Sequence, residues 1–341
     1  MPENRITVAI PTLTADAALS ECVRSLGAQT LQGFAAVVVD NSGQGLARQR
    51  LNRDKLGCPW LHVIENIENV GFGAAVNQAA AGWKSPFLAT LNDDAVADPR
   101  WLEELLSAIE SGPDVGMAAS QVRLFGRDEL DSAGMLICGD GSSKQRGHGA
   151  PPPRYGRREE VLAPSGSAAL YRQSMLDEIG GFDEDFFLYC EDTDLGLRAR
   201  WAGWRCVYAP QAVVQHHYSR TAGRATPLKA YYVERNRLAL LVKNFPVPNL
   251  LVAPWISITR YFWHMVTLAK GRGVAARFRQ DGGGALSMTA LAIRAHWSLL
   301  RNWRRLWEKR RAVARTARIP PSAFARLLRA HAISAREVAE S

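Results

Sequence analysis

The fold is decided by residues 6–40, ITVAIPTLTADAALSECVRSLGAQTLQGFAAVVVD. Two short apolar runs, Ile6 to Ile10 and Ala35 to Val39, have the length and composition of strands that are buried on both faces. Between them, apolar residues recur at helical spacing from Ala17 to Gln29. A strand, a helix and a second strand in this order predict a β-α-β unit with parallel strands.

The same alternation continues along the chain. Further strands are expected at 61–64, 87–91 and 205–208. Further helices are expected at 72–83, 99–111, 174–179 and 192–202. Pro99 suits the first turn of its helix, where a missing N–H does no harm. Residues 139–158, rich in Gly, Pro and Arg, predict a long loop.

Composition places the chain among globular proteins. With 341 residues and 47% apolar content, it can bury the core of one large domain with an appendage, or of two modest domains. Its five cysteines are odd in number and lack C-x-x-C spacing, which argues against a disulfide framework and a zinc knuckle. The N-terminal residues lack the pattern of a secretion signal, so a cytoplasmic protein is expected.

The formal charge of +9 is concentrated near the C-terminus. Residues 270–329 hold fifteen Lys or Arg against two acids, with Trp297, Trp303 and Trp307 among them. Such a segment can face anionic lipid headgroups or a nucleic acid, or it can be a solvated helix face. The longest apolar stretch, 250–269, is interrupted by Pro254, Arg260 and His264 and is expected to be interfacial or packed, not spanning.

Ligands of open α/β sheets bind outside the carboxyl ends of the strands, and polar residues follow several expected strands. Asp40-Asn41 follows the second strand, where the Asp40 carboxylate can accept a hydrogen bond from a ribose hydroxyl or a base N–H, or can open an Asx turn. The stretch 69–77, NVGFGAAVN, is a glycine-containing turn that leads into a helix. The helix N-terminus can approach a diphosphate, although Val76 stands where the dinucleotide fingerprint has its third glycine.

Asn92-Asp93-Asp94 follows the strand at 87–91. Two adjacent carboxylates at a strand end are costly unless a cation or hydrogen-bond donors compensate them. Mg²⁺ or Mn²⁺ commonly binds through one or two carboxylates together with phosphate oxygens. The alternative is an N-cap cluster for the next helix, a role that suits Asp98 better.

The segment 183–194 carries six carboxylates in twelve residues. Asp192 or Asp194 can cap the helix that follows, since acids favour helix N-termini. A carboxylate held there is equally suited to take a proton from an acceptor hydroxyl. The doublet His216-His217 can complete a metal shell through one imidazole, or be an ordinary core or surface pair.

In their order, these pieces resemble the family 2 glycosyltransferases, and specifically their rhamnosyltransferase-like branch. The resemblance covers roughly residues 5–220. The matching stretches are 8–12 (VAIPT), 38–42 (VVDNS), 69–77 (NVGFGAAVN), 91–94 (LNDD), 180–187 (GGFDEDFF) and 191–200 (EDTDLGLRAR).

The resemblance implies an α/β fold of the GT-A type, with a mixed, mostly parallel sheet and a basic helical C-terminal extension. The catalytic domain is expected at 1–227, with its nucleotide-binding half at about 1–122 and its acceptor-binding half at about 123–227. The helical region then occupies 228–341 and is expected to associate with an anionic membrane surface.

The resemblance also implies roles for individual residues. Asp192 matches the base of an inverting reaction, with Glu191 beside it. Asp94 and one histidine, with His216 favoured over His217, match the ligands of Mg²⁺ or Mn²⁺. Asn92 stands where the family's metal motif has its first Asp and is given no metal bond. The residues expected to bind the nucleotide are Pro11, Thr12, Asp40, Asn41, Asn69, Gly71, Asn77, Asn92 and Asp93.

The implied reaction moves a sugar from a nucleotide-diphosphate donor to an acceptor hydroxyl with inversion. The branch suggests dTDP-rhamnose, with UDP-sugars as alternatives, and a lipid-linked or cell-surface polysaccharide precursor as acceptor. The protein is then expected on the inner face of the plasma membrane, without a nucleic-acid partner. Two other readings stay open: a sugar nucleotidyltransferase of similar fold, and a non-catalytic nucleic-acid-binding protein that uses the basic tail.

Overall fold

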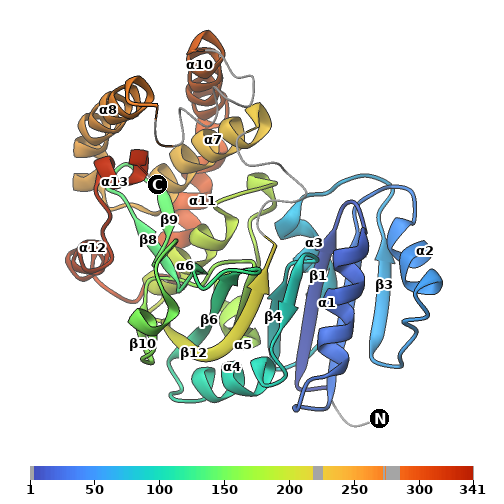
Figure 1. The fold of residues 1–341 in the computed structure, drawn as a ribbon. Helices are drawn as coiled ribbons and strands as arrows, with labels where there is room; N and C mark the ends of the chain where they lie inside the picture. The colour runs from blue at the N-terminus through green and yellow to red at the C-terminus, as the bar shows by residue number, and fades with distance from the viewer. Residues whose placement is uncertain (1–3, 218–225, 272, 274–284, 341) are drawn as a thin grey trace. The chain divides into compact units, whose positions relative to one another are not determined.

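The computed structural model describes residues 4–217, 226–271, 273 and 285–340 (Figure 1). The chain splits into two compact units. The first, called here the sheet unit, comprises Met1–Met135, Gln145–Ala199 and Trp204–Thr221. The second, the helical unit, comprises Leu136–Lys144, Arg200–Gly203 and Ala222–Ser341. The expected boundary at residue 227 stays a prediction.

The sheet unit is built on one large sheet with the strand order β10-β12-β6-β11-β4-β1-β2-β3. These strands are β1 (Ile6–Thr12), β2 (Phe34–Asp40), β3 (Leu61–Glu65), β4 (Phe87–Leu91), β6 (Val115–Leu124), β10 (Glu159–Val161), β11 (Ala168–Arg172) and β12 (Arg205–His216). The β3-β2-β1-β4 pairs and the β6-β12 pair are parallel, while β11 runs antiparallel between β4 and β6. The sheet is therefore mixed and mostly parallel, which confirms the expected fold class.

Helices cover both faces of this sheet. On one face lie α1 (Ala17–Gly27), α2 (Leu46–Arg53) and α4 (Trp101–Ile109), and on the other lie α3 (Phe72–Gly82), α5 (Gln173–Ile179) and α6 (Glu191–Trp201). Each face has its own apolar core, because side chains along each central strand alternate between the two. The short strand β5 (Ala95–Ala97) pairs with β12, and the short strand β7 (Leu130–Ser132) pairs with β6.

The structure differs from the expected local structure at four places. Helix α2 was not expected, because only Ala47 and Leu51 of its eight residues are buried and the apolar period is too sparse to detect. Helix α4 begins at Trp101 and not at Pro99, because Asp98 closes a turn by accepting hydrogen bonds from the backbone N–H groups of residues 100 and 101. The expected loop at 139–158 contains β9 (Ser143–Gln145) and the 3-10 helix η1 (Pro152–Tyr155). Strand β12 continues to His216 because an irregularity in its register between Ala209 and Val213 absorbs Pro210.

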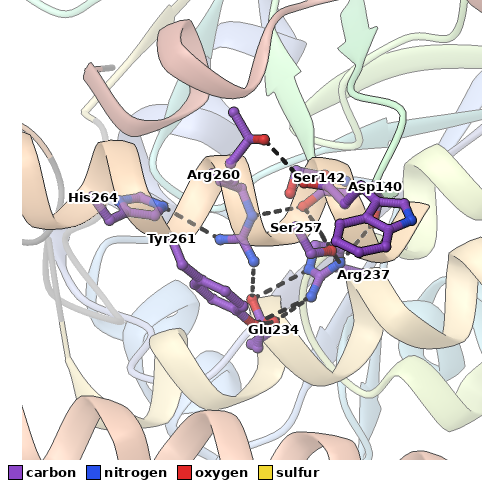
Figure 2. A network of polar contacts seen from close by, with 10 residues as sticks. Asp140, Ser142, Glu234, Arg237, Ser257, Arg260, Tyr261 and His264 are labelled. Atoms are coloured by element: carbon purple, nitrogen blue, oxygen red, sulfur yellow. Dashed lines mark hydrogen bonds and ion pairs between the residues drawn. The ribbon is translucent and has the colours of Figure 1, made fainter. Parts of the chain in front are cut away.

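The helical unit contains α7 (Pro227–Asn244), α8 (Val247–Ala269), α10 (Ala285–Arg301), α11 (Trp303–Thr316), α12 (Pro321–Ala330) and α13 (Ala335–Glu340). The short strand β8 (Met135–Ile137) pairs with β9. In the core of the unit the Trp201 ring stacks on Phe324 with centroids 4.0 Å apart. A second, polar core joins Asp140, Glu234, Arg237 and Arg260 (Figure 2). Across the residues that the structure describes, no helix has the length and apolar character needed to cross a membrane.

Candidate active site

The predicted site residues gather where β1, β2 and β4 end, since parallel neighbours place their carboxyl ends at one edge of the sheet. Thr12 is the last residue of β1 and Asp40 is the last of β2. Asn92 directly follows β4, and β12 brings His216 to the same edge. The topology thus assembles residues that lie up to 204 positions apart in the chain.

The central contact of this edge is between Asp94 and His216. Asp94 Oδ1 lies 3.0 Å from His216 Nε2, and Asn92 Nδ2 lies 3.2 Å from the same nitrogen. The other ring nitrogen, Nδ1, lies 2.8 Å from Asp131 Oδ2. Asp131 is 2% exposed and is the middle residue of β7, so the imidazole is held between two carboxylates.

The contacts between His216 and its neighbours shift the pKa of the imidazole and the pKa of Asp94. Burial opposes the imidazolium, but the hydrogen bonds to Asp131 and Asp94 outweigh it and raise the pKa of His216 to about 10. Burial likewise opposes ionisation of Asp94, yet its hydrogen bond to His216 leaves the pKa of Asp94 below its usual value. The protein thus favours an ionised Asp94 beside a protonated His216, and a cation bound at Nε2 would replace the proton on that nitrogen.

The donor set at this edge fits a divalent cation that also binds phosphate. A carboxylate and an imidazole nitrogen converge here, and a second carboxylate, Asp131, orients the imidazole, as is usual for metal-bound histidines. No three His, Cys, Asp or Glu side chains in the described part of the chain form a complete metal shell. Mg²⁺ commonly takes its other ligands from phosphate oxygens and water.

The second histidine of the doublet points elsewhere. The His217 ring stacks on Phe125 with centroids 3.8 Å apart, and its Nε2 lies 3.4 Å from Glu21 Oε2. Successive side chains at a strand end point to opposite faces, which separates the two rings. The structure therefore brings the side chain of His216, and not that of His217, to the Asp94 carboxylate.

Asp93 turns toward β1. Its Oδ2 accepts a hydrogen bond of 2.5 Å from the Thr12 hydroxyl, which itself accepts from the backbone N–H of Ala15. Burial raises the pKa of Asp93 to about 7, with the charge of Asp94 adding to the effect and the Thr12 hydrogen bond opposing it. The two adjacent carboxylates thus have different surroundings, and Asp94 is the one beside the histidine.

Asp192 is held on both of its oxygens. Oδ2 accepts a hydrogen bond of 2.8 Å from the backbone N–H of Gly166, and Oδ1 accepts from the backbone N–H of Thr193 at 2.6 Å and from its hydroxyl at 3.1 Å. Burial raises the pKa of Asp192, and these hydrogen bonds oppose the shift. The side chain remains partly exposed at the start of α6, so its free lone pairs can meet a ligand.

Glu191 is different from its neighbour. It is 7% exposed, and its Oε2 has no hydrogen-bond partner in the described structure. Burial, followed by the charge of Asp192, raises the pKa of Glu191 to about 8. The Glu-Asp pair therefore carries one carboxyl that is stable as the neutral acid near neutral pH.

The segment 165–167 connects the two groups of acids. Gly166 donates to Asp192, while the carbonyl of the next residue, Ser167, accepts a hydrogen bond of 2.8 Å from the backbone N–H of Asn92. A Cβ at position 166 would lie 3.2 Å from Asp192 Cβ, so only glycine lets this carboxylate approach the backbone without displacement. Sequence reasoning missed both Gly166 and Asp131; the serines on either side of Gly166 and the Asp-Ser pair at 131–132 give no functional signal by themselves.

The residues expected to bind the nucleotide also have contacts within the protein. Asp40, 1% exposed, accepts hydrogen bonds of 2.8 Å from the backbone N–H groups of Ser42 and Ala47. Asn41 Oδ1 accepts from Asn66 Nδ2 at 2.8 Å. Asp40 thus forms the Asx turn that the sequence left open and holds the first turn of α2. Pro11 lies inside β1, opposite Val39 of β2.

The glycine turn before α3 does not have the open N-terminus that the sequence suggested. The backbone N–H of Phe72 donates to the carbonyl of Phe187 at 2.9 Å, and a Cβ on Gly71 would lie 2.4 Å from that oxygen. Gly71 has φ of 87°, and Asn69 Oδ1 accepts from its N–H. Gly71 therefore permits a close approach to the protein's own loop, at the carbonyl of Phe187.

Asn77 lies apart from the strand ends. Its side chain donates to the carbonyl of Phe182 and accepts from the N–H of Phe182, both at 2.9 Å, and fixes the turn at 180–182 to α3. From the other side Arg198, paired with Asp194 at 2.8 Å, donates to the carbonyls of residues 179–181. These contacts fix the position of the acidic segment, whose residues 187, 189 and 190 have positive φ.

Comparisons with known proteins agree with this arrangement. Residues 2–239 match the family model described as "Glycosyltransferase like family 2". The chain is 30% identical over 245 residues to N-acetylglucosaminyl-diphospho-decaprenol L-rhamnosyltransferase of Mycobacterium tuberculosis, covering 63% of this chain and 77% of the relative. Over a shorter stretch of 90 residues it is 42% identical to rhamnosyltransferase WbbL of Escherichia coli, covering 24% of this chain and 33% of that relative.

Two solved structures share the fold at low identity. GalNAc-T7, solved with UDP, GalNAc and Mn²⁺, superposes with a TM-score of 0.58 at 15% identity; the match covers 82% of this chain and only 54% of GalNAc-T7. The mannosyltransferase PcManGT of Pyrobaculum calidifontis, solved with GDP-Man and Mn²⁺, superposes with a TM-score of 0.51 at 18% identity and covers 91% of this chain and 86% of its own. The expected GT-A-type fold is thereby confirmed. With its sequence match over more than two thirds of its length, this chain belongs to the glycosyltransferase family 2-like proteins and is a glycosyltransferase.

Proposed function

We propose that this protein is an inverting, metal-dependent rhamnosyltransferase that uses Asp192 as its base. The observation that carries the proposal is the position of Asp192. The backbone N–H of Gly166 holds its carboxylate, and the next residue, Ser167, accepts a hydrogen bond from the backbone N–H of Asn92. A base and a cation-binding group joined through one rigid segment are what a single displacement at an anomeric carbon requires.

The cation would be held by Asp94 and His216, with Asp131 orienting the imidazole through Nδ1. When bound, a divalent ion acts as a Lewis acid that stabilises the negative charge of the departing nucleoside diphosphate. Asp93 would take part indirectly, because its hydrogen bond to Thr12 fixes the peptide that positions Asp94. PcManGT and GalNAc-T7, both solved with Mn²⁺, make the same ion the first to test here.

In the proposed step the acceptor hydroxyl gives its proton to an Asp192 oxygen while its own oxygen forms the new bond to the anomeric carbon. The bond between that carbon and the diphosphate oxygen breaks with its electron pair leaving on the diphosphate. Attack from the face opposite the leaving group inverts the anomeric configuration. One carboxylate is enough, so Glu191, neutral near pH 7, would shape the site and not exchange the proton.

The nucleotide would lie along the ends of β1 and β2. There Thr12 and Asp40 are buried and held, and Asn41 and Asn69 fix the loops around them. Under this proposal Asp40 positions the loop at 41–46 and the exposed groups of that loop meet the base and ribose. Asn77 would act at a distance by holding the acidic segment.

Two relatives named as rhamnosyltransferases favour rhamnose as the sugar and a lipid-linked diphosphate glycan as the acceptor. The donor would then be dTDP-rhamnose, with UDP-sugars as the alternatives. The test is to incubate the protein with Mg²⁺ or Mn²⁺ and a panel of nucleotide sugars, and to measure release of nucleoside diphosphate with and without EDTA. Release from dTDP-rhamnose alone that EDTA abolishes supports the proposal, whereas turnover of a UDP-sugar in preference to it refutes the choice of sugar.

A further inference from the structure

Helix α8 of the helical unit has its polar side turned inward. The buried positions Ala253, Arg260 and Thr267 are spaced by seven residues and mark the side that faces the unit. A helix on the surface of a water-soluble protein normally buries its apolar stripe and exposes its charges. In α8 the one arginine is 6% exposed, so the ordinary arrangement is reversed.

Figure 2 shows how the inward side is held. Arg260 Nε donates to Asp140 Oδ2 at 2.7 Å, and its Nη2 donates to Glu234 Oε2 at 2.9 Å. The next residue, Tyr261, donates its hydroxyl proton to Glu234 Oε1 at 2.5 Å. Arg237 from α7 pairs with both acids, so two arginines and two carboxylates neutralise each other inside the unit. This network fixes the rotation of α8 about its axis.

The outward side of α8 is apolar along its length. Its large exposed side chains, all between 52% and 74% exposed, are Leu251, Val252, Trp255, Ile258, Phe262 and Met265. From 251 to 269 the exposed positions carry no charge, and the single exposed hydroxyl, that of Thr259, donates to the carbonyl of Trp255 in its own helix. A continuous exposed apolar face of this kind marks an interaction site.

We propose that this face of α8 lies in the surface of a lipid bilayer rich in anionic lipids, with the helix axis in the membrane plane. Large aromatic and aliphatic side chains with no acid among them are the groups that partition into the boundary between headgroups and acyl chains. The sequence that follows α8 has a charge complementary to such a surface: residues 270–329 hold fifteen Lys or Arg against two acids. A second stripe, Ile293, Trp297 and Leu300 on α10, is also exposed and is followed by Arg301.

This inference concerns only the surface of the helical unit and does not rest on the identity of the sugar. A general electrostatic attraction between the basic tail and anionic lipids would involve no particular helix face. The insertion proposed here involves one uncharged face, that of α8. The polar side of α8 stays with the protein through Asp140 and Glu234. Lipid would therefore meet the apolar side chains, while the cationic residues of the neighbouring segments would remain at the level of the headgroups.

The test uses the full chain and flotation with two kinds of vesicle, phosphatidylcholine alone and phosphatidylcholine mixed with phosphatidylglycerol. The variants are Ile258→Glu on α8 and, as a matched control, Ile67→Glu, since Ile67 is a 95% exposed isoleucine of the sheet unit. We expect the wild type to bind the anionic vesicles. Binding by Ile258→Glu should fall at least about tenfold, and binding by Ile67→Glu should be unchanged. Equal binding by all three proteins overturns the proposal.

A second measurement covers the case in which Ile258→Glu fails to fold. Brominated lipids in the same vesicles should quench the fluorescence of the wild type more strongly than that of Trp255→Phe, because Trp255 would lie within the acyl boundary. Equal quenching of the two proteins contradicts insertion of this face. A wild type that dimerises and leaves the vesicles unbound, and that Ile258→Glu makes monomeric, would assign the face to a second copy of the chain and overturn the proposal.

Discussion

The backbone N–H of Gly166 donates a hydrogen bond of 2.8 Å to Asp192 Oδ2, and the neighbouring carbonyl of Ser167 accepts from the N–H of Asn92 at 2.8 Å. The backbone of two consecutive residues, Gly166 and Ser167, therefore holds the start of α6 and the end of β4 in a fixed relation. The relation is made by backbone atoms, so it depends on the shape of the 165–167 segment more than on the identity of its side chains.

Gly166→Ala tests this relation. The new Cβ would lie 3.2 Å from Asp192 Cβ and 3.5 Å from its Oδ2, so the carboxylate must shift by a few tenths of an ångström. We expect turnover to fall about tenfold or more while donor affinity, measured by calorimetry, changes little. Gly57→Ala is the control, because a Cβ there meets nothing within 4 Å. Equal turnover of the two variants would contradict a positioning role for Gly166.

Asp131→Asn tests the orientation of His216. The variant keeps the size of the side chain but removes the charge beside Nδ1, which should weaken metal binding by about tenfold or more. We expect the Mn²⁺ concentration for half-maximal activity to rise by that factor and the activity to recover at saturating Mn²⁺. Asp114→Asn, on an exposed aspartate paired with Arg205, is the control. A loss that excess metal does not repair would show that Asp131 acts in another way.

Glu191→Gln tests the protonation of the buried pair. Because burial raises the pKa of Glu191 from 4.5 to about 8, the folded state holds a proton that the unfolded state has lost between these values. This contribution to stability is fully present below about pH 4.5 and is lost as the pH rises to about 8. The variant lacks this titration, so its melting temperature relative to the wild type should rise between about pH 5 and about pH 8. A difference that stays constant with pH would contradict a raised pKa.

The same variant separates the roles of the two acids. Since Glu191 is neutral near pH 7, its replacement by glutamine should leave turnover there within about threefold of the wild type. A loss as large as that expected for a catalytic base would move the proton-accepting role to Glu191.

Much of the sheet unit could be predicted from the sequence because its signals are local. The apolar runs of β1, β2, β3 and β4 each stand between clear helical or turn patterns, and the polar residues that follow them mark one edge of the sheet. The edge itself follows from parallel pairing. Asp94 and His216, by contrast, could be placed together only through the family resemblance, because the strand that carries His216 was expected to end at Tyr208.

The rest of the site depends on contacts that leave no local pattern. Asp131 becomes a partner of His216 only because β7 pairs with β6, which pairs with β12, and that register is set by tertiary packing. In the sequence Gly166 has the pattern of an ordinary turn residue. Its role depends on the Asp192 side chain, which lies against it only in the folded structure. Asp140 likewise gives no local signal of its partner. It precedes α8 by more than a hundred residues, yet it pairs with Arg260 on the buried side of that helix.

The most direct test of the account compares the wild type with Asp192→Asn in one transfer assay with dTDP-rhamnose and Mn²⁺, with and without EDTA. Asparagine has one amide oxygen, so it can keep the hydrogen bonds from Thr193 to Oδ1 or the one from Gly166 to Oδ2 but not both, and it cannot accept a proton from the acceptor. We expect turnover to fall by a factor of about 10² to 10⁴ with donor affinity nearly unchanged, and EDTA to abolish the wild-type activity. Turnover by Asp192→Asn equal to that of the wild type would remove Asp192 from the role of base, and full activity in EDTA would remove the metal.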